Sequence, residues 1–100
     1  MRKVIAKYTN NQLDGRYEVY DSNNNLIERG KYKNGRKDIF WRKYYKNGNT
    51  KSIRFYDNGK LDGVYCLYDR NGKLIIRGRF SQGVKVGKWE LYRFLNKSED

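Results

Sequence analysis

The chain has 100 residues, which is the size of a single domain. Apolar residues make up only 37% of it and the mean hydropathy is -1.11, whereas aromatic residues reach 16%. These values exclude a large dry core, so tyrosine, which buries area while keeping a hydroxyl in water, is expected to replace aliphatic side chains.

The charge balance is strongly basic. Lys and Arg number 23 against 11 Asp and Glu, a formal net charge of +12. Solubility asks for a net charge of roughly 2 to 8 in a small domain, so the excess favours an acidic or polyanionic partner. The alternative is that the charge only keeps an open sheet soluble and prevents edge pairing.

The composition argues against catalysis. The chain has no histidine, and so lacks the usual general base and the commonest metal ligand. Cys66 is the only cysteine, which excludes an intramolecular disulfide and fits a small packed residue in a reducing compartment. We expect no enzyme activity, no cofactor and no metal site. The first residues lack the apolar run of a signal peptide and no stretch could span a membrane, which predicts a cytoplasmic protein.

A repeat of 24 residues organises the sequence. It is marked by Asp14-Gly15, Asp38-Ile39, Asp62-Gly63 and Val86-Gly87, and the aromatic residues that follow keep the same spacing. The chain thus divides into a half repeat (1–13), repeats 14–37, 38–61 and 62–85, and a half repeat (86–94). Together they form one domain, 1–94, followed by a polar tail, 95–100.

Each repeat contains β-rich segments separated by Asn-Gly or similar dipeptides, the strongest short-range signal for a β-hairpin with a two-residue type I′ turn. The chain is therefore expected to be all-β, a single-layer antiparallel meander of about eight strands. The predicted strands lie near residues 2–8, 15–20, 25–33, 39–46, 50–57, 63–69, 73–80 and 87–94. Two-residue turns fix the register, and Tyr45 should then face Thr50.

This register separates an aromatic face from a basic face. The candidate partner-binding residues of the aromatic face are Tyr17, Trp41, Tyr45, Tyr65, Trp89, Tyr32, Tyr56 and Phe80. Those of the basic face are Arg16, Arg29, Lys31, Arg42, Lys51, Arg54, Arg77 and Arg79, which could contact a protein or a nucleic acid. For the aromatic rings the alternative is that they only pack on one another.

Two details of packing follow from this register. Gly30 and Gly78 should lie opposite Tyr17 and Tyr65, where the missing side chain lets each tyrosine ring lie over the backbone. Arg54 should lie opposite Trp41, and its guanidinium is expected to stack on the indole.

The segments 15–20 (GRYEVY), 44–48 (YYKNG), 55–63 (FYDNGKLDG) and 87–92 (GKWELY) resemble MORN repeats. They are most similar to the bacterial variant of YwqK-type antitoxins, and the resemblance covers about residues 7–93. It implies an elongated single-layer meander that contacts proteins and sometimes phospholipids, and the antitoxin likeness implies a protein partner. Asn24, Ile39 and Arg54 stand where glycine is usual in such repeats, which favours adaptation of the central unit to a specific contact.

The leading functional hypothesis is a non-enzymatic protein-binding module. It would be an antitoxin or immunity-like protein, or a phage-type inhibitor of a bacterial effector such as a nuclease with bound RNA or DNA. Trp41 and Trp89 are expected to act as binding anchors, each with one ring face exposed. The alternative is direct binding of nucleic acid or anionic phospholipid through the basic face. Two unpaired edge strands also predict a tendency to homodimerise.

Overall fold

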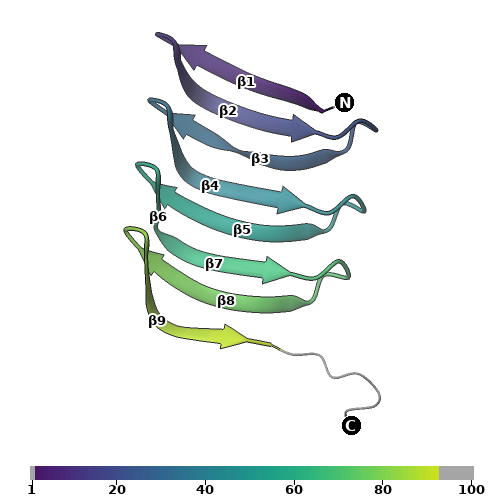
Figure 1. The fold of residues 1–100 in the computed structure, drawn as a ribbon, viewed down its shortest axis with the longest axis vertical. Coiled ribbons are helices and arrows are strands. Elements are labelled where there is room, and N and C mark those ends of the chain that lie inside the picture. The colour runs from purple at the N-terminus through teal and green to yellow at the C-terminus, as the bar shows by residue number, and fades with distance from the viewer. Residues whose placement is uncertain (1, 93–100) are drawn as a thin grey trace.

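The computed structural model describes residues 2–92, which form one open antiparallel sheet of nine strands (Figure 1). In chain order the strands are β1 (Lys3–Thr9), β2 (Gln12–Tyr20), β3 (Leu26–Lys33), β4 (Arg36–Tyr44), β5 (Thr50–Asp57), β6 (Lys60–Leu61), β7 (Gly63–Tyr68), β8 (Leu74–Ser81) and β9 (Val84–Leu91). Each pairs with its neighbour along the chain, except that β7 pairs with β5, beside the short β6. The expected all-β meander is confirmed.

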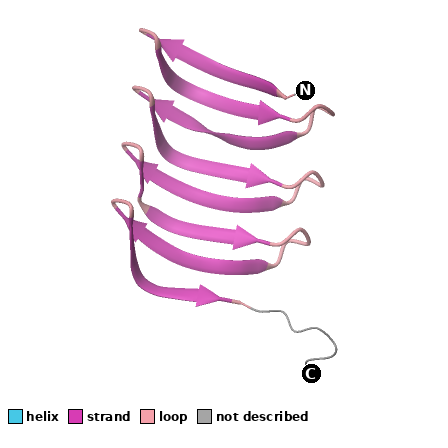
Figure 2. Cartoon of the chain, viewed as in Figure 1, coloured by secondary structure: helices cyan, strands magenta, loops and turns pink. Residues whose placement is uncertain are grey.

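The sheet is a single layer, with principal extents of 57 × 37 × 13 Å. Every connection is a short loop at one of the two strand ends, and β1 and β9 form the two open edges (Figure 2). The part of the chain described here contains no helix, and hence none long and apolar enough to cross a membrane. The predicted tail 95–100 and the last two residues of the final predicted strand lie outside the described range.

Several strands begin earlier than expected. β2, β4 and β9 each start three residues before the predicted position, because a two-residue turn lets the next strand pair at once. The predicted strand 63–69 corresponds to β7, and the short β6 is an additional strand that precedes it, separated from it at Asp62.

The two ends of the sheet use different turns. At one end, pairs such as Asn34-Gly35 and Asn58-Gly59 have positive φ at both residues, as the predicted type I′ turn requires. At the other end only one residue per turn has positive φ, for example Gly48 with φ 91°. The Tyr45 amide donates to Asn49 O at 2.8 Å, and Tyr44, not Tyr45, is the register partner of Thr50. The predicted pairing of Tyr45 with Thr50 is therefore wrong, because the loop has three residues and ends in a bulge.

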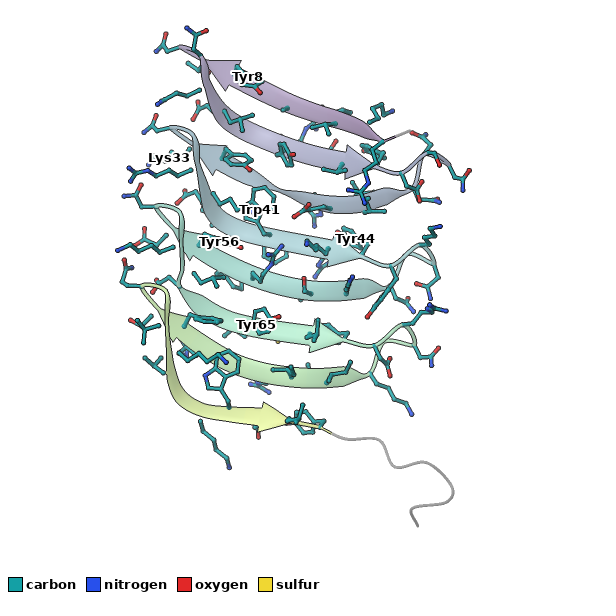
Figure 3. The ribbon with its side chains drawn as sticks, in the orientation of Figure 1. Tyr8, Lys33, Trp41, Tyr44, Tyr56 and Tyr65 are labelled. Carbon is teal, nitrogen blue, oxygen red and sulfur yellow. The ribbon has the colours of Figure 1, made fainter. Side chains whose placement is uncertain are left out.

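The core is very thin. Among residues 2–92 only the side chains of Val19, Trp41 and Ser52 are buried. Trp41 is fully buried, with 0% of its surface exposed, although the sheet has no second layer. Aromatic neighbours on the same face must therefore cover it, and they do so from three strands (Figure 3).

Candidate functional site

Trp41 is the centre of the first aromatic cluster. Its ring lies 5.6 Å from Tyr17, 5.2 Å from Tyr32 and 6.3 Å from Tyr56, the last two edge to face. The indole Nε1 donates to Lys31 O at 3.1 Å, and Lys37 Nζ lies 4.6 Å from the ring centre. The neighbouring side chains thus cover the apolar faces of the indole, and its polar N–H group has a hydrogen-bond acceptor.

Trp89 repeats the arrangement 48 residues later. Its ring lies 5.9 Å from Tyr65 and 5.1 Å from Phe80, and Lys85 Nζ lies 4.9 Å from its centre. Trp89 is only half-buried, and its Nε1 donates to no acceptor among the residues described. The second cluster is thus a looser copy of the first.

The glycines beneath these rings explain why the indoles lie flat. As expected, Gly30 and Gly78 are the register partners of Tyr17 and Tyr65. The rings that cover them, however, are those of Trp41 and Trp89 on the following strand, so the prediction that the tyrosines lie there is wrong. A Cβ at Gly30 would come within 2.1 Å of Trp41 Cδ2.

Arg54 occupies the glycine position of the middle repeat. It is the register partner of Trp41 as predicted, but its guanidinium lies over Tyr56, at 5.8 Å, and Lys37 is the cation over the indole. Arg54 also contacts Glu28 at 3.5 Å and donates to the Tyr56 hydroxyl at 3.1 Å. Arg54 therefore belongs to the aromatic face, and its assignment to the basic face is wrong.

Burial perturbs the ionisable groups of the aromatic face. Desolvation raises the pKa of Tyr56 and of Tyr32 above 10.0. Desolvation, and then the neighbouring Arg54 charge, lowers the pKa of Lys37 below 10.5. In all three groups burial is the largest cause of the pKa shift.

The structure also corrects the expected anchoring role of Trp41. A fully buried ring offers no surface to a partner, so Trp41 is a core residue and not an exposed anchor.

Tyr45 lies apart from both clusters, where its hydroxyl donates to Tyr68 O at 2.7 Å and Lys51 Nζ lies 5.7 Å from its ring. Lys51 is thereby engaged by an aromatic residue at the turn instead of extending the basic face.

The opposite face carries a row of side chains that crosses the whole sheet. Its members are successive register partners, in the order Ile5, Glu18, Arg29, Arg42, Ile53, Cys66, Arg77 and Glu90. A second row beside it contains Arg16 opposite Lys31 and, further along, Val64 opposite Arg79. The face therefore brings together the predicted residues Arg16, Arg29, Lys31, Arg42, Arg77 and Arg79.

Arg29 and Arg42 make an unusual pair within this row, because like charges directly opposite each other destabilise a sheet. Within residues 2–92 the ion pairs are Arg16–Glu18 and Arg54–Glu28, so neither arginine of the pair is neutralised there. Arg29 Nε donates to the Tyr44 hydroxyl at 2.8 Å, whereas Arg42 Nε is buried and donates to no acceptor in that range.

Phe40 lies between these two arginines. The guanidinium carbons of Arg29 and Arg42 are 5.6 and 5.3 Å from its ring centre, and Phe55 contacts it edge to face at 5.4 Å. Phe40 and its neighbour Ile39 also line a hollow of about 270 Å³, together with Arg16, Arg29, Gly30 and Lys31. We call this the Ile39 hollow.

Sequence reasoning did not select Phe40, Phe55, Ile39 or Lys37 as site residues. The only signal for any of them was that Ile39 replaces the glycine found at the equivalent position of the other units. Alternation along β4 places Phe40 on the same face as Arg42, but its position beside Arg29 could not be inferred, because β3 and β4 change register between Arg29 and Lys31, opposite this segment.

The recurring aspartates have a structural role. Asp62 Oδ1 accepts a hydrogen bond from the Gln82 amide at 3.0 Å, and Asp14 accepts one from the Asn34 amide at 3.3 Å. Each of these aspartates thus fixes the second turn of its own repeat. Cys66 is half-buried between Ile53 and Arg77. Residues 2–92 contain no group of three or more His, Cys, Asp and Glu side chains that could hold a metal ion.

A repeated hairpin sheet with two chemically distinct faces defines a binding module. The family comparison agrees, because residues 13–34, 41–58 and 61–82 match the MORN repeat variant. These segments make up more than half of the chain, which therefore belongs to this family. MORN repeats are generally associated with binding to membranes or proteins. A search of curated proteins found no match.

Proposed function

We propose that this protein is a protein-binding module of the antitoxin, immunity or phage-inhibitor kind, and that it holds an acidic surface of a bacterial effector against its basic face. The observation that carries the proposal is the Arg29–Arg42 pair. Two guanidiniums directly opposite each other cost stability, and the nearest carboxylate in the row, that of Glu18 on the other side of Arg29, forms its ion pair with Arg16. A partner carboxylate would neutralise both arginines.

The repeat itself shows that the fold does not require this pair. The residues equivalent to Arg42 in the neighbouring units are Glu18, Cys66 and Glu90, and the residue that follows Arg29 by one repeat is Ile53. At the corresponding place in the last unit, Arg77 lies opposite Glu90, an arrangement of opposite charges. The positive charge is therefore concentrated where β3 meets β4.

The basic face is a better candidate than the aromatic face. The rings of the first aromatic cluster pack against one another, and Trp41 has no exposed surface. On the basic face, by contrast, Arg16 has 74% of its side chain exposed, and Arg29 and Lys31 are also exposed.

A protein partner also fits this face better than nucleic acid does. Binding of single strands needs aromatic rings with open faces on which bases stack. Phe40 is instead flanked by two guanidiniums and by Phe55. The row of arginines is also interrupted by Ile53 and Cys66, so it offers no continuous phosphate track. Nucleic acid and anionic lipid are expected to bind weakly and only at low salt.

The test compares two double variants that remove the same charge. Arg29→Gln/Arg42→Gln alters the proposed contact, and Arg77→Gln/Arg79→Gln is the matched control on the same face. Each is immobilised and exposed to nuclease-treated lysate of the protein's own cells at physiological salt. Wild type and control should retain the same stoichiometric protein, and the first variant should lose it.

Two results would refute the proposal. One is capture that occurs only from lysate not treated with nuclease, or displacement of the bound material by anionic vesicles. The other is an equal loss of binding in both double variants, because this would mean that overall charge and not the Arg29–Arg42 pair is recognised.

A further inference from the structure

Ile39 has a backbone conformation that β-branched residues avoid. Its φ is +62°, in the left-handed region, where the branched side chain crowds its own backbone. The equivalent residues of the other units are Gly15, Gly63 and Gly87, all with positive φ. The repeat thus needs this conformation at the bulge, and glycine would adopt it without strain.

The strained side chain is also displayed to solvent, because Ile39 is 52% exposed. It gains little from burial in its own chain, so packing does not explain its presence. Strain held at an exposed position is typical of residues retained for a contact. The Ile39 hollow, in which it lies beside Phe40, has Arg16, Arg29 and Lys31 at its border.

A related hollow in the last unit provides a contrast within the same molecule. It is lined by Val64, Arg77, Gly78, Arg79, Lys88 and Glu90. Lys88 and Glu90 stand there in place of Phe40 and Arg42, and Gly87 stands in place of Ile39. Both hollows have an excess of positive charge, but the second contains the carboxylate of Glu90 and has Val64 as its apolar side chain. Of the two, only the first combines an isoleucine and a phenylalanine with three cations and no carboxylate.

We propose that the Ile39 hollow is an apolar socket within a ring of cations, and that it binds an acidic segment of a protein partner by taking up one apolar side chain flanked by carboxylates. The inference rests on the proposed function and specifies the chemistry of that partner. Ile39 and Phe40 contact the apolar side chain, while Arg16, Arg29 and Lys31 face the carboxylates on either side. The positive charges attract the acidic segment, and the apolar socket determines which of its residues lies over Ile39 and Phe40.

The test uses two fluorescent peptides of 11 residues and equal charge, in which Glu alternates with Ser. One carries Leu at the centre and the other carries Ser there. Partial burial of one leucine side chain should make the Leu peptide bind wild type about 3- to 10-fold more tightly at physiological salt, measured by fluorescence anisotropy. Ile39→Gly should abolish this preference while raising the melting temperature by a few degrees, because the strain is removed.

Gly87→Ile is the matched control. It introduces the same side chain at an equivalent bulge with φ +70°, where an added Cβ meets no atom within 4 Å. This variant should lower the melting temperature and leave the Leu preference intact. Stability and binding are thereby separated at two positions with nearly the same backbone conformation.

The socket is refuted if wild type does not distinguish the two peptides, or if Ile39→Gly keeps the preference. In either case capture of a partner that depends on Arg29 and Arg42 would still support the proposed function. Oligothymidylate of equal length is the third probe. If it binds more tightly than both peptides at about 0.3 M salt, the site belongs to nucleic acid and both proposals fail.

Discussion

Gly30→Ala is the substitution that most directly probes the single-layer core. An alanine Cβ would lie 2.1, 2.3 and 2.6 Å from three atoms of the Trp41 ring, far inside the 3.5 to 4.0 Å of an ordinary carbon contact. The ring cannot retreat, because it is fully buried and its Nε1 donates to Lys31 O. Overpacking of a core costs about 1–3 kcal/mol and loss of the hydrogen bond about 1 kcal/mol more. We therefore expect Gly30→Ala to lower the free energy of unfolding by about 3 kcal/mol.

For a domain of this size, such a loss lowers the melting temperature by about 12–24 °C. The assay is thermal unfolding followed by near-ultraviolet circular dichroism. Gly78→Ala is the matched control, since its Cβ would meet Trp89 just as closely, at 2.1 Å, but Trp89 is half-buried and its ring is free to swing outward. Its loss should be less than half as large. Alanine normally stabilises a strand relative to glycine, so a Gly30→Ala protein as stable as wild type would refute the packing described for Trp41.

Three further predictions concern the turns, the ring cluster and the edges. Asp62→Ala should destabilise the fold by about 1 kcal/mol in urea unfolding, because Asp62 accepts a hydrogen bond from the Gln82 amide. Asp38→Ala should cost less, since within residues 2–92 the Asp38 side chain accepts no such bond, and equal losses would contradict this. Because the pKa of Tyr56 is raised, its contribution to stability is fully present below pH about 10 and is lost as pH rises through the folded pKa. Because the pKa of Lys37 is lowered, its penalty for the charged form disappears as pH rises, which partly offsets that loss. Stability should therefore fall more steeply with alkaline pH in Lys37→Met than in wild type. The open edge strands β1 and β9 predict self-association that grows with protein concentration. It should also grow with salt, because salt screens the repulsion between chains of net charge +12. A monomeric mass by light scattering under all conditions would count against it.

The repeat made much of the fold predictable. Spacing alone placed Gly30 opposite Tyr17 and separated the two faces, because a two-residue period and fixed turns determine which residues share a side. The turn at Asn47-Gly48 was assigned the wrong geometry, since this dipeptide suits both a type I′ turn and a type I turn ending in a bulge. The structure distinguishes the two by the hydrogen bond from the Tyr45 amide to Asn49 O and by the positive φ of Gly48 but not of Asn47.

The candidate site was less predictable for a physical reason. The indole of Trp41 reaches across to the neighbouring strand and lies over Gly30, and such diagonal packing depends on twist and side-chain direction that the sequence pattern does not contain. For the same reason the position of the Arg54 guanidinium, over Tyr56 instead of Trp41, could not be inferred from register. The departure of Ile39 from glycine was visible in the sequence, but its exposure beside Phe40 was not.

The most direct test of the account is to map the contact surface by NMR during titration with the captured partner, or with the Leu peptide. The signals to follow are the Ile39 methyl groups and the Nε–H groups of Arg29 and Arg42, with the ring protons of Tyr32 and Tyr56 as reporters of the opposite face. The account predicts that the Ile39 and arginine signals shift together, and that the tyrosine rings remain unchanged. Shifts confined to the tyrosine rings, or to the edge strands β1 and β9, would contradict the assignment of the basic face as the binding surface.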